Sequence, residues 1–208
     1  MPTPTFDNLP EDKKERILNA AIKEFGLRNV QEGNLANIVK DAKIARGSIY
    51  QYFVSKEDLY VYIFDTLRSK RAEYVKPAYE LYKKEPFLRF FEEFYLRDTE
   101  FLLMHPAHIE LGKQLYGSSN PTSQGLIRQI QTKYKELFLV GIEYDKDRGL
   151  IDPKVESSVL ADLFVHLVTD IFIFQSIYSQ LSMQNLRHHC EQTLYFIKYG
   201  ILSKPNHD

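Results

Sequence analysis

Several features that would reveal a function at once are scarce in this sequence. Cys190 is the single cysteine, so no disulfide forms within the chain and a reducing compartment is expected. The 27 Lys and Arg residues are balanced by 28 Asp and Glu residues, so no overall positive field attracts nucleic acid. Any affinity for nucleic acid must therefore come from a local cluster of charge.

Long apolar segments are missing as well. The most apolar stretch, residues 160–174, is interrupted by Asp162, His166 and Asp170, and it is too short and too polar to span a bilayer. Residues 1–14 lack the apolar core of a signal peptide. The composition, 44% hydrophobic and 26% charged, favours a soluble globular protein. We expect a cytoplasmic protein with no membrane partner.

Helical periodicity runs along nearly the whole chain, and no segment alternates as a half-buried strand does. We therefore expect an all-α fold. Asn34 is expected to cap one helix, the Ser55/Asp58 capping box another, and Asp152-Pro153 to begin a third. The spacing predicts helices from near Pro10 through Phe25, then at 35–42, 45–51, 56–77, 86–104, 106–116, 123–145, 153–180 and 183–202.

Three short helices, with a tight turn at Lys43 and Ile44 between the second and third, follow the layout of a helix-turn-helix. Many small three-helix bundles share this layout, so the pattern alone leaves both interpretations open. Residues 37–56 carry four basic side chains against one acidic, a local charge of +3, from Lys40, Lys43, Arg46 and Lys56 against Asp41.

Specific residues go further than the layout. The segment 35–59 resembles the DNA-binding signature of the TetR family of transcriptional regulators, through Arg46-Gly47-Ser48-Ile49-Tyr50, Tyr52-Phe53, Ser55-Lys56 and Leu59. Upstream, Ile17 to Ala21 and Phe25 resemble the first helix of that family. The resemblance implies a three-helix DNA-binding domain at 1–55 and a helical-bundle domain at 56–208 for ligand binding and dimerisation. It further implies a homodimeric repressor that a small ligand releases from a palindromic double-stranded DNA operator.

The resemblance places the helix at 45–51 in the major groove. Gly47 would let the backbone approach DNA closely, and Arg46 can bind a phosphate or a guanine edge. Tyr52 is open to two interpretations, a DNA contact or a core residue. The residues expected at DNA are Asn34, Lys43, Ala45, Arg46, Gly47, Ser48, Tyr50, Gln51, Tyr52 and Lys56.

Three positions depart from the usual pattern of the family. Lys43 stands where a glycine is common, and a positive φ there would strain a lysine by about 1 kcal/mol. Ala45 replaces the usual Ser or Thr, which removes a helix cap. Asn29 also occupies a common glycine position, which asparagine tolerates better than most residues. Each departure can alter operator preference.

The middle helices are rich in aromatic residues, which line both cores and ligand pockets. The sequence leaves these two interpretations open; a pocket of this kind favours a small apolar or aromatic ligand. The candidate ligand-binding residues are Phe91, Phe94, Tyr95, Tyr134, Phe138, His166 and Asp170.

The last two predicted helices carry apolar residues on more than one face, so they need more than one packing partner. A second copy of the chain would supply one, and packing within a single chain is the alternative. The candidate dimer residues are Leu163, Leu167, Phe174, Leu194, Ile197 and Ile201.

Other classes of function find less support. The chain has no P-loop, GxGxxG or HExxH motif, and its one candidate acid–base pair, Asp162 with His166, lacks a nucleophile. Asp162, His166 and Asp170 lie on one helical stripe, where a metal would need ligands from elsewhere. We expect that stripe to be a polar contact or solvated, and we expect no enzyme, cofactor or metal. A helical scaffold that binds protein without recognising DNA is the alternative function.

Overall fold

A computed structural model of the chain describes residues 2–178 and 182–200, with side chains for 2–169 and 182–200. These residues are helical with no strand among them, which confirms the all-α expectation. The side chains of Asp170 and Phe174, and all of Ile201, lie outside the described residues. Within the described part of the chain, no helix is both long and apolar enough to cross a membrane.

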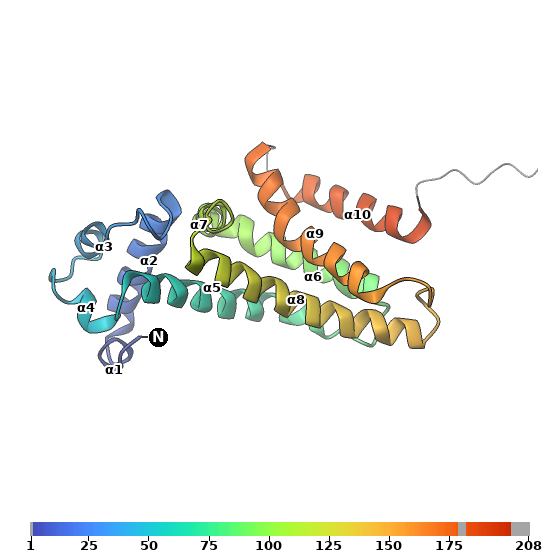
Figure 1. Ribbon diagram of the computed structural model, residues 1–208, viewed down its shortest axis with the longest axis horizontal. Helices are drawn as coiled ribbons and strands as arrows, with labels where there is room; N and C mark the ends of the chain where they lie inside the picture. Colours follow the sequence, from blue (N-terminus) through green and yellow to red (C-terminus); the bar gives the residue numbers. More distant parts are fainter. Residues whose placement is uncertain (1, 179–181, 201–208) are drawn as a thin grey trace, which may run out of the picture.

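The helices form two groups along one long axis (Figure 1). The first gathers at one end: α1 (Pro4–Asp7), α2 (Glu11–Leu27), α3 (Leu35–Asp41) and α4 (Ile49–Tyr52). The second forms an elongated bundle: α5 (Lys56–Tyr79), α6 (Phe87–Met104), α7 (Pro106–Tyr116), α8 (Pro121–Asp147), α9 (Ser157–Tyr178) and α10 (Met183–Tyr199). The short helix α7 lies where the two groups meet.

Two of the expected helix starts are confirmed in atomic detail. The Asn34 side chain accepts a hydrogen bond from the backbone N–H of Ala36, and the Ser55 hydroxyl accepts one from the N–H of Asp58. Each satisfies a donor that the first turn of a helix leaves unpaired. These caps fix the start of α3 and of α5 on either side of α4.

Other helix boundaries were wrong. The third short helix begins at Ile49 rather than Ala45, and Ser48 donates its N–H to Ala45 O at 2.9 Å within a preceding turn. The helix α9 begins at Ser157 rather than Pro153, because the Asp152 carboxylate accepts from the N–H of Lys154 and closes a turn instead. The helix α1, a single turn with a proline in its first position, was not expected from the sequence.

The apolar residues form two main cores. The first lies under α1–α4 and the start of α5, and it includes Leu111 and Leu115 of α7 and Leu126 of α8. The second fills the bundle with the aromatic residues of α6, packed on Phe138 of α8 and Phe164 of α9. The helices α2 and α7 pack against each other at Gly26, where an added Cβ would lie in ordinary contact with Glu110, at 3.5 Å from its Cβ. The two groups of helices are thus joined by a packed contact.

Candidate functional site

The turn at 43–48 and α4 present an exposed surface at one end of the molecule. Tyr50 is 67% exposed and Ser48 is partly exposed. The other residues expected at DNA in this stretch are also exposed: Lys43, Ala45, Arg46, Gly47 and Gln51. Lys43 has a φ of 55°, so the backbone is left-handed at this position, one of the two outcomes that the sequence left open. At Asn29, by contrast, φ is not positive, and its side chain caps the N–H groups of Gln31 and Glu32.

Tyr52 is corrected to a core residue. It is 3% exposed, and its ring centroid lies 6.0 Å from that of Phe6. The reason is helical spacing: Tyr52 follows Ile49 by three positions, so both lie on the buried face of α4. The opposite face of this helix carries Tyr50 and Gln51 outward.

Nothing in the fold requires a glycine at position 47. Its φ is not in the left-handed region, and a Cβ added to it would meet nothing within 4 Å. An alanine would therefore fit the fold without strain. A glycine at an exposed turn is useful where another molecule must approach the backbone closely.

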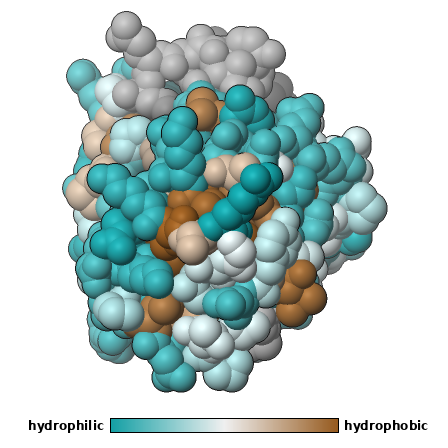
Figure 2. Space-filling view, turned by 90° about the vertical axis from the view of Figure 1, so that its left-hand side faces the viewer, coloured by the Kyte–Doolittle hydropathy of each residue, from teal (hydrophilic) through white to brown (hydrophobic). Residues whose placement is uncertain are grey.

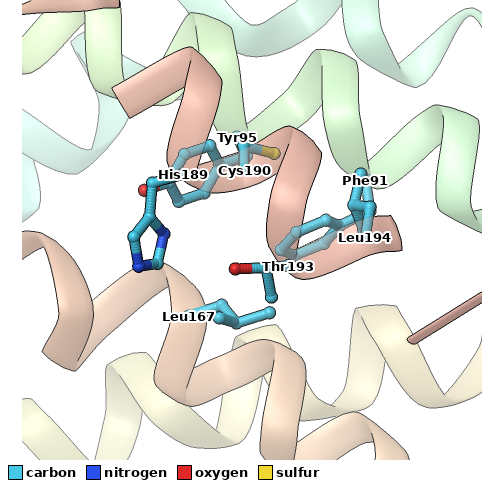
Figure 3. A pocket seen from close by; sticks show the side chains of 7 residues that line it. All are labelled: Phe91, Tyr95, Leu167, His189, Cys190, Thr193 and Leu194. Atoms are coloured by element: carbon cyan, nitrogen blue, oxygen red, sulfur yellow. The ribbon is translucent and has the colours of Figure 1, made fainter. Parts of the chain in front are cut away.

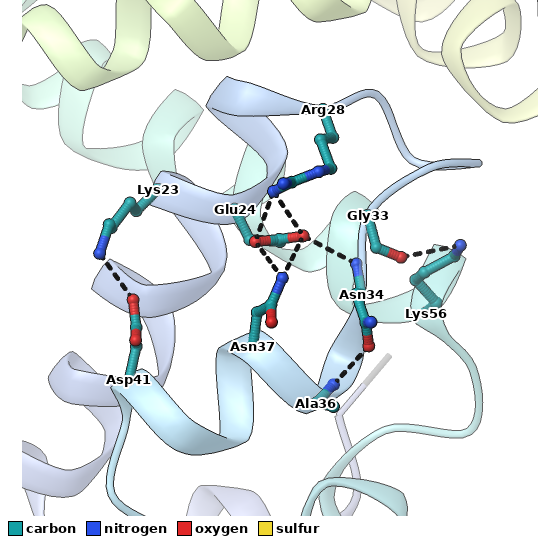
Figure 4. A network of polar contacts seen from close by, with 9 residues as sticks. All are labelled: Lys23, Glu24, Arg28, Gly33, Asn34, Ala36, Asn37, Asp41 and Lys56. Carbon is teal, nitrogen blue, oxygen red and sulfur yellow. Dashed lines mark hydrogen bonds and ion pairs between the residues drawn. The ribbon is translucent and has the colours of Figure 1, made fainter.

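A buried carboxylate holds α2 against the start of α3 (Figure 4). Glu24 is almost fully buried and accepts hydrogen bonds from the N–H of Asn34 at 2.9 Å and from the side-chain amide of Asn37. Arg28 donates to the same carboxylate at 3.3 Å. Sequence reasoning missed this network, because a glutamate on a helix is usually exposed. Asn34 therefore has a structural role, at the position where a DNA contact was also expected.

Lys56 binds the loop between α2 and α3. Its ammonium donates to Gln31 O at 2.7 Å and to Gly33 O at 3.1 Å (Figure 4). Gly33 is required here, because an added Cβ would lie 2.6 Å from the Phe25 ring. Two of the three donors of the ammonium are thus engaged, and one remains for a further acceptor.

The charge on this surface is positive once the ion pairs are considered. Lys23 and Asp41 neutralise each other at 2.7 Å. The exposed Lys40, Lys43 and Arg46 make no ion pair with a residue that the structure describes. The end of the molecule formed by α1–α4 is mainly hydrophilic, with small apolar patches (Figure 2). Such local cations suit a polyanion even though the whole chain is nearly neutral.

A family model described as "Bacterial regulatory proteins, tetR family" matches residues 17–63. This range contains every residue of the exposed surface described above. The N-terminal part of the chain is therefore of the TetR-family type, as the resemblance predicted.

Three similar proteins agree with this assignment. The uncharacterized HTH-type transcriptional regulator YhgD of Bacillus subtilis (strain 168) is 26% identical over 165 residues, which is 76% of this chain and 84% of YhgD. A TetR family transcriptional regulator from Chloroflexus aurantiacus J-10-FL has a TM-score of 0.71 at 19% identity, covering 98% of this chain and 100% of its own. FadR from Bacillus subtilis, solved in complex with stearoyl-CoA, has a TM-score of 0.74 at 18% identity, covering 90% and 99%. These comparisons support a transcriptional regulator of the TetR type over a protein-binding scaffold, and they point to no enzyme family.

In the helical bundle, the expected ligand-binding aromatics are tightly packed together. Phe91, Phe94, Tyr95 and Phe138 are all buried, and the ring centroids of Phe91 and Phe138 are 5.5 Å apart. Tyr134 stacks on Phe138 at 5.9 Å with nearly parallel rings. In this conformation they form a core.

A small cavity lies between α6, α9 and α10 (Figure 3). It has room for about one water molecule. Of the expected ligand-binding residues whose side chains the structure describes, only Phe91 and Tyr95 line it, whereas Phe94, Tyr134 and Phe138 do not. His166 is exposed on the outer side of α9, so its expected place in a pocket is corrected. The full lining is Phe91, Tyr95, Leu167, His189, Cys190, Thr193 and Leu194.

A polar cluster inside the bundle was missed by sequence reasoning. The guanidinium of Arg71 on α5 donates to both carboxylate oxygens of Asp98 on α6. Burial opposes charge on Arg71, but the Asp98 carboxylate outweighs it and raises the pKa of the guanidinium. Burial also raises the pKa of the nearby Tyr134 hydroxyl, which stays neutral. The pairing joins residues 27 positions apart on two helices, and local spacing gives no signal for it.

The exposed apolar residues of the last two helices differ from most of those expected. Leu163 is 44% exposed, in agreement with a surface role. Leu167 is buried in the bundle core and is corrected to an intramolecular contact. Leu194 and Ile197 are partly buried against that core, and their place at a dimer face stays a prediction. The apolar residues that do face outward here are Val159, Leu163, Tyr195, Phe196 and Tyr199.

Among the residues with described side chains, no group of three or more His, Cys, Asp and Glu side chains is arranged to hold a metal ion. Asp162 instead pairs with Lys135 at 2.7 Å. The acid–base pair considered from the sequence is thus occupied by a salt bridge between α8 and α9.

Proposed function

We propose that this regulator binds a palindromic DNA operator as a homodimer and represses transcription until a ligand releases it. The main observation behind the proposed DNA-binding surface is Gly47, an exposed glycine that the fold does not require. The exposed cations Lys43 and Arg46 lie in the same turn. Close backbone approach to a polyanion accounts for both the missing side chain and the cations. Two-fold symmetry then requires half-sites about 34–36 Å apart, one helical turn, or a multiple of that distance.

The residues of this surface have different proposed roles. Arg46 binds a guanine edge or a phosphate, while Ser48, Tyr50 and Gln51 contact bases or backbone at the exposed face of the turn and α4. Ala45 and Gly47 allow close approach. Lys43 binds a phosphate; Asn34 and the remaining donor of Lys56 are candidates for backbone contacts.

We place the domain division at the start of α5, with DNA binding at 1–55 and ligand binding and dimerisation at 56–208. The Ser55 cap supports this boundary, because it separates α4 from the long helix α5. The first apolar core nevertheless continues across it to α7 and α8. The two domains are therefore connected by packing as well as by the chain.

The proposed dimer face combines Leu163 of α9 with Tyr195, Phe196 and Tyr199 of α10. These side chains are large, apolar and exposed, and they lie on the last two helices. A second copy would remove them from water, and burial of apolar area is the main driving force of stable association.

The proposed ligand is a small apolar or aromatic molecule. The aromatic core of the bundle supports an apolar ligand, as does the likeness of the fold to FadR from Bacillus subtilis, which was solved with stearoyl-CoA. The small cavity beside Phe91 and Tyr95 would have to widen, so binding would separate α6 from α9 or α10. A ligand shifts an equilibrium only by binding one state more tightly, which is how widening would weaken DNA binding.

The DNA-binding proposal is tested with two matched glycine variants. Gly47→Ala adds a methyl group at the DNA surface, and Gly125→Ala adds one to α8, where a Cβ also meets nothing within 4 Å. Operator fragments are first selected from genomic DNA with the wild-type protein, and affinity is then measured by fluorescence anisotropy. We expect Gly47→Ala to lose operator affinity and Gly125→Ala to keep it. Equal affinities for both variants, or no DNA selected at all, would contradict the proposal.

A further inference from the structure

We infer that the N-terminal segment Thr3–Asp7 is a positioning element for α4, and that Thr3 determines how well the helix recognises its operator. The inference rests on the proposed DNA-binding function of α4. The segment itself makes no proposed DNA contact; it acts by holding the helix that does.

The helix α4 cannot hold its shape by itself. It is a single turn of four residues, Ile49–Tyr52. Forming one turn fixes several backbone angles for one hydrogen bond, so an isolated turn is unfavourable. At its N-terminal end, Ser48 makes no side-chain capping bond. Stability must therefore come from contacts outside the helix.

Thr3 supplies contacts at the C-terminal end. Its hydroxyl donates to Gln51 O at 2.6 Å, and its backbone N–H donates to Tyr52 O at 2.9 Å. The last carbonyls of a helix have no partner within the helix. One residue, 48 positions away in the sequence, satisfies two of them.

Phe6 anchors this segment to the core beneath α4. It is fully buried, and its ring lies 4.8 Å from that of Phe53 and 5.4 Å from that of Tyr62, between centroids. Figure 1 shows α1 beside α4 at the end of the molecule away from the bundle. Thr3 is thus held in place by a buried aromatic three residues later in the chain.

The consequence concerns specificity more than affinity. Contacts to base edges need an accurately placed helix, whereas contacts to phosphates tolerate small shifts. Loss of the Thr3 hydroxyl should therefore weaken binding to the operator while binding to unrelated DNA is unchanged. The exposed cations Lys43 and Arg46 remain in place for that non-specific binding.

Two substitutions at one position test this. Thr3→Val keeps the shape of the side chain but removes its hydroxyl, and Thr3→Ser keeps the hydroxyl. Hydrogen exchange is measured at two amides that report on α4: that of Gln51, which donates to Ser48 O, and that of Phe53, which donates to Ile49 O. The amide of Ala42, which donates to Ile38 O in α3, is the control. We expect faster exchange at residues 51 and 53 in Thr3→Val only, with Ala42 unchanged. Wild-type exchange in Thr3→Val would overturn the inference.

The same proteins are then tested on DNA. One hydrogen bond corresponds to about a two- to tenfold change, so the ratio of operator to non-specific affinity should fall by that factor in Thr3→Val and recover in Thr3→Ser. Faster exchange without a change in this ratio would overturn the role in recognition. If the wild type selects no operator, the proposed function fails, and the exchange data still decide whether Thr3 holds α4.

Phe6→Ala provides a second check on the anchor. It should increase exchange at residues 51 and 53 by more than Thr3→Val does, because both Thr3 bonds lose their support. The network around Glu24 keeps α3 folded independently of α1, so Ala42 serves as the control. If the amides of residues 51 and 53 exchange as slowly in Phe6→Ala as in the wild type, and Ala42 stays protected, the inference is also overturned.

Discussion

Arg71 of α5 and Asp98 of α6 bind each other through two parallel hydrogen bonds inside the helical bundle. Asp98 is almost entirely buried, and the guanidinium of Arg71 is the cation that binds it there. The helix that carries Arg71 begins at Lys56, immediately after the proposed DNA surface. The pair therefore ties the helix that follows α4 to the middle of the bundle.

Removing one member of this pair should be strongly destabilising. Arg71→Met leaves the Asp98 carboxylate buried without its partner, and losses of about 3–5 kcal/mol are typical of such changes. Arg89→Met is the control, because its pair with Glu92 is more exposed and should contribute about 1 kcal/mol or less. Urea unfolding of both variants measures the difference. Similar midpoints for the two would contradict this assignment.

Lys43 offers a test that separates charge from backbone strain. Lys43→Gly and Lys43→Ala both remove the charge, and both should reduce the salt dependence of DNA binding equally. Only glycine relieves the left-handed backbone at φ 55°, so Lys43→Gly should be more stable than Lys43→Ala by about 1 kcal/mol. Thermal unfolding checks the second expectation and anisotropy in a salt series the first. A stability difference of zero would show that the turn relaxes in the variants.

Arg46→Ala distinguishes two kinds of DNA contact. If Arg46 binds a base, its loss should weaken operator binding by about 1–3 kcal/mol and relax preference at one position. If it binds only phosphate, preference at every position should survive. Affinities for a set of single-position operator variants give the answer. An unchanged affinity for all of them would exclude Arg46 from the interface.

The oligomeric state should respond to charge on the exposed apolar face. Leu163→Arg and Phe196→Asp each place a charge among side chains that we expect to be buried between two copies, so the dimer should dissociate. Leu27→Arg is the control, because Leu27 is also exposed but lies at the end of α2. Sedimentation at micromolar concentration provides the measurement. If the wild type is a monomer, or if both charged variants remain dimers, the proposed dimer face is wrong.

His108 should make stability depend on pH. Burial, followed by the charges of His105, Lys70 and Arg71, lowers the pKa of His108 to about 4. The unfolded chain takes up this proton near pH 6.5, but the folded chain does so only near pH 4. The free energy of unfolding should therefore fall as the pH drops from about 6.5 towards 4.

His108→Gln removes that titration, so the difference in unfolding free energy between about pH 7 and about pH 4.5 should shrink. His189→Gln is the comparison, since burial also lowers the pKa of His189 but less strongly. If the two variants and the wild type lose the same stability over this interval, His108 is not the responsible group.

The sequence predicted what depends on local pattern. The caps at Asn34 and Ser55 follow from neighbouring residues, and the structure agrees with both. The exposed surface around Gly47 came from a signature that lies within one short segment. These features involve contacts between residues close in the chain, for which spacing is informative.

Features that depend on distant residues were not predictable in this way. The helix α4 is shorter than expected at its start and is capped at its end by Thr3, far away in the sequence. Leu167 was expected at the dimer face but is buried in the bundle core, because periodicity shows only that a helix has apolar faces, not which one the core takes. The Arg71–Asp98 pair likewise needs the arrangement of two helices before it can be recognised.

The packing of α7 against α2 affects how such a protein can be recombined with its relatives. Leu111 and Leu115 complete the apolar core of the DNA-binding part, although they lie some fifty residues beyond the matched segment 17–63. A chimera that exchanges only that segment would set a foreign α2 against the native α7. The two helices are in direct contact at Gly26, so the side chains that meet there would no longer be matched. Exchanges that carry α7 along with the N-terminal helices should yield folded hybrids, so a new operator preference is inherited together with a piece of the sensing domain.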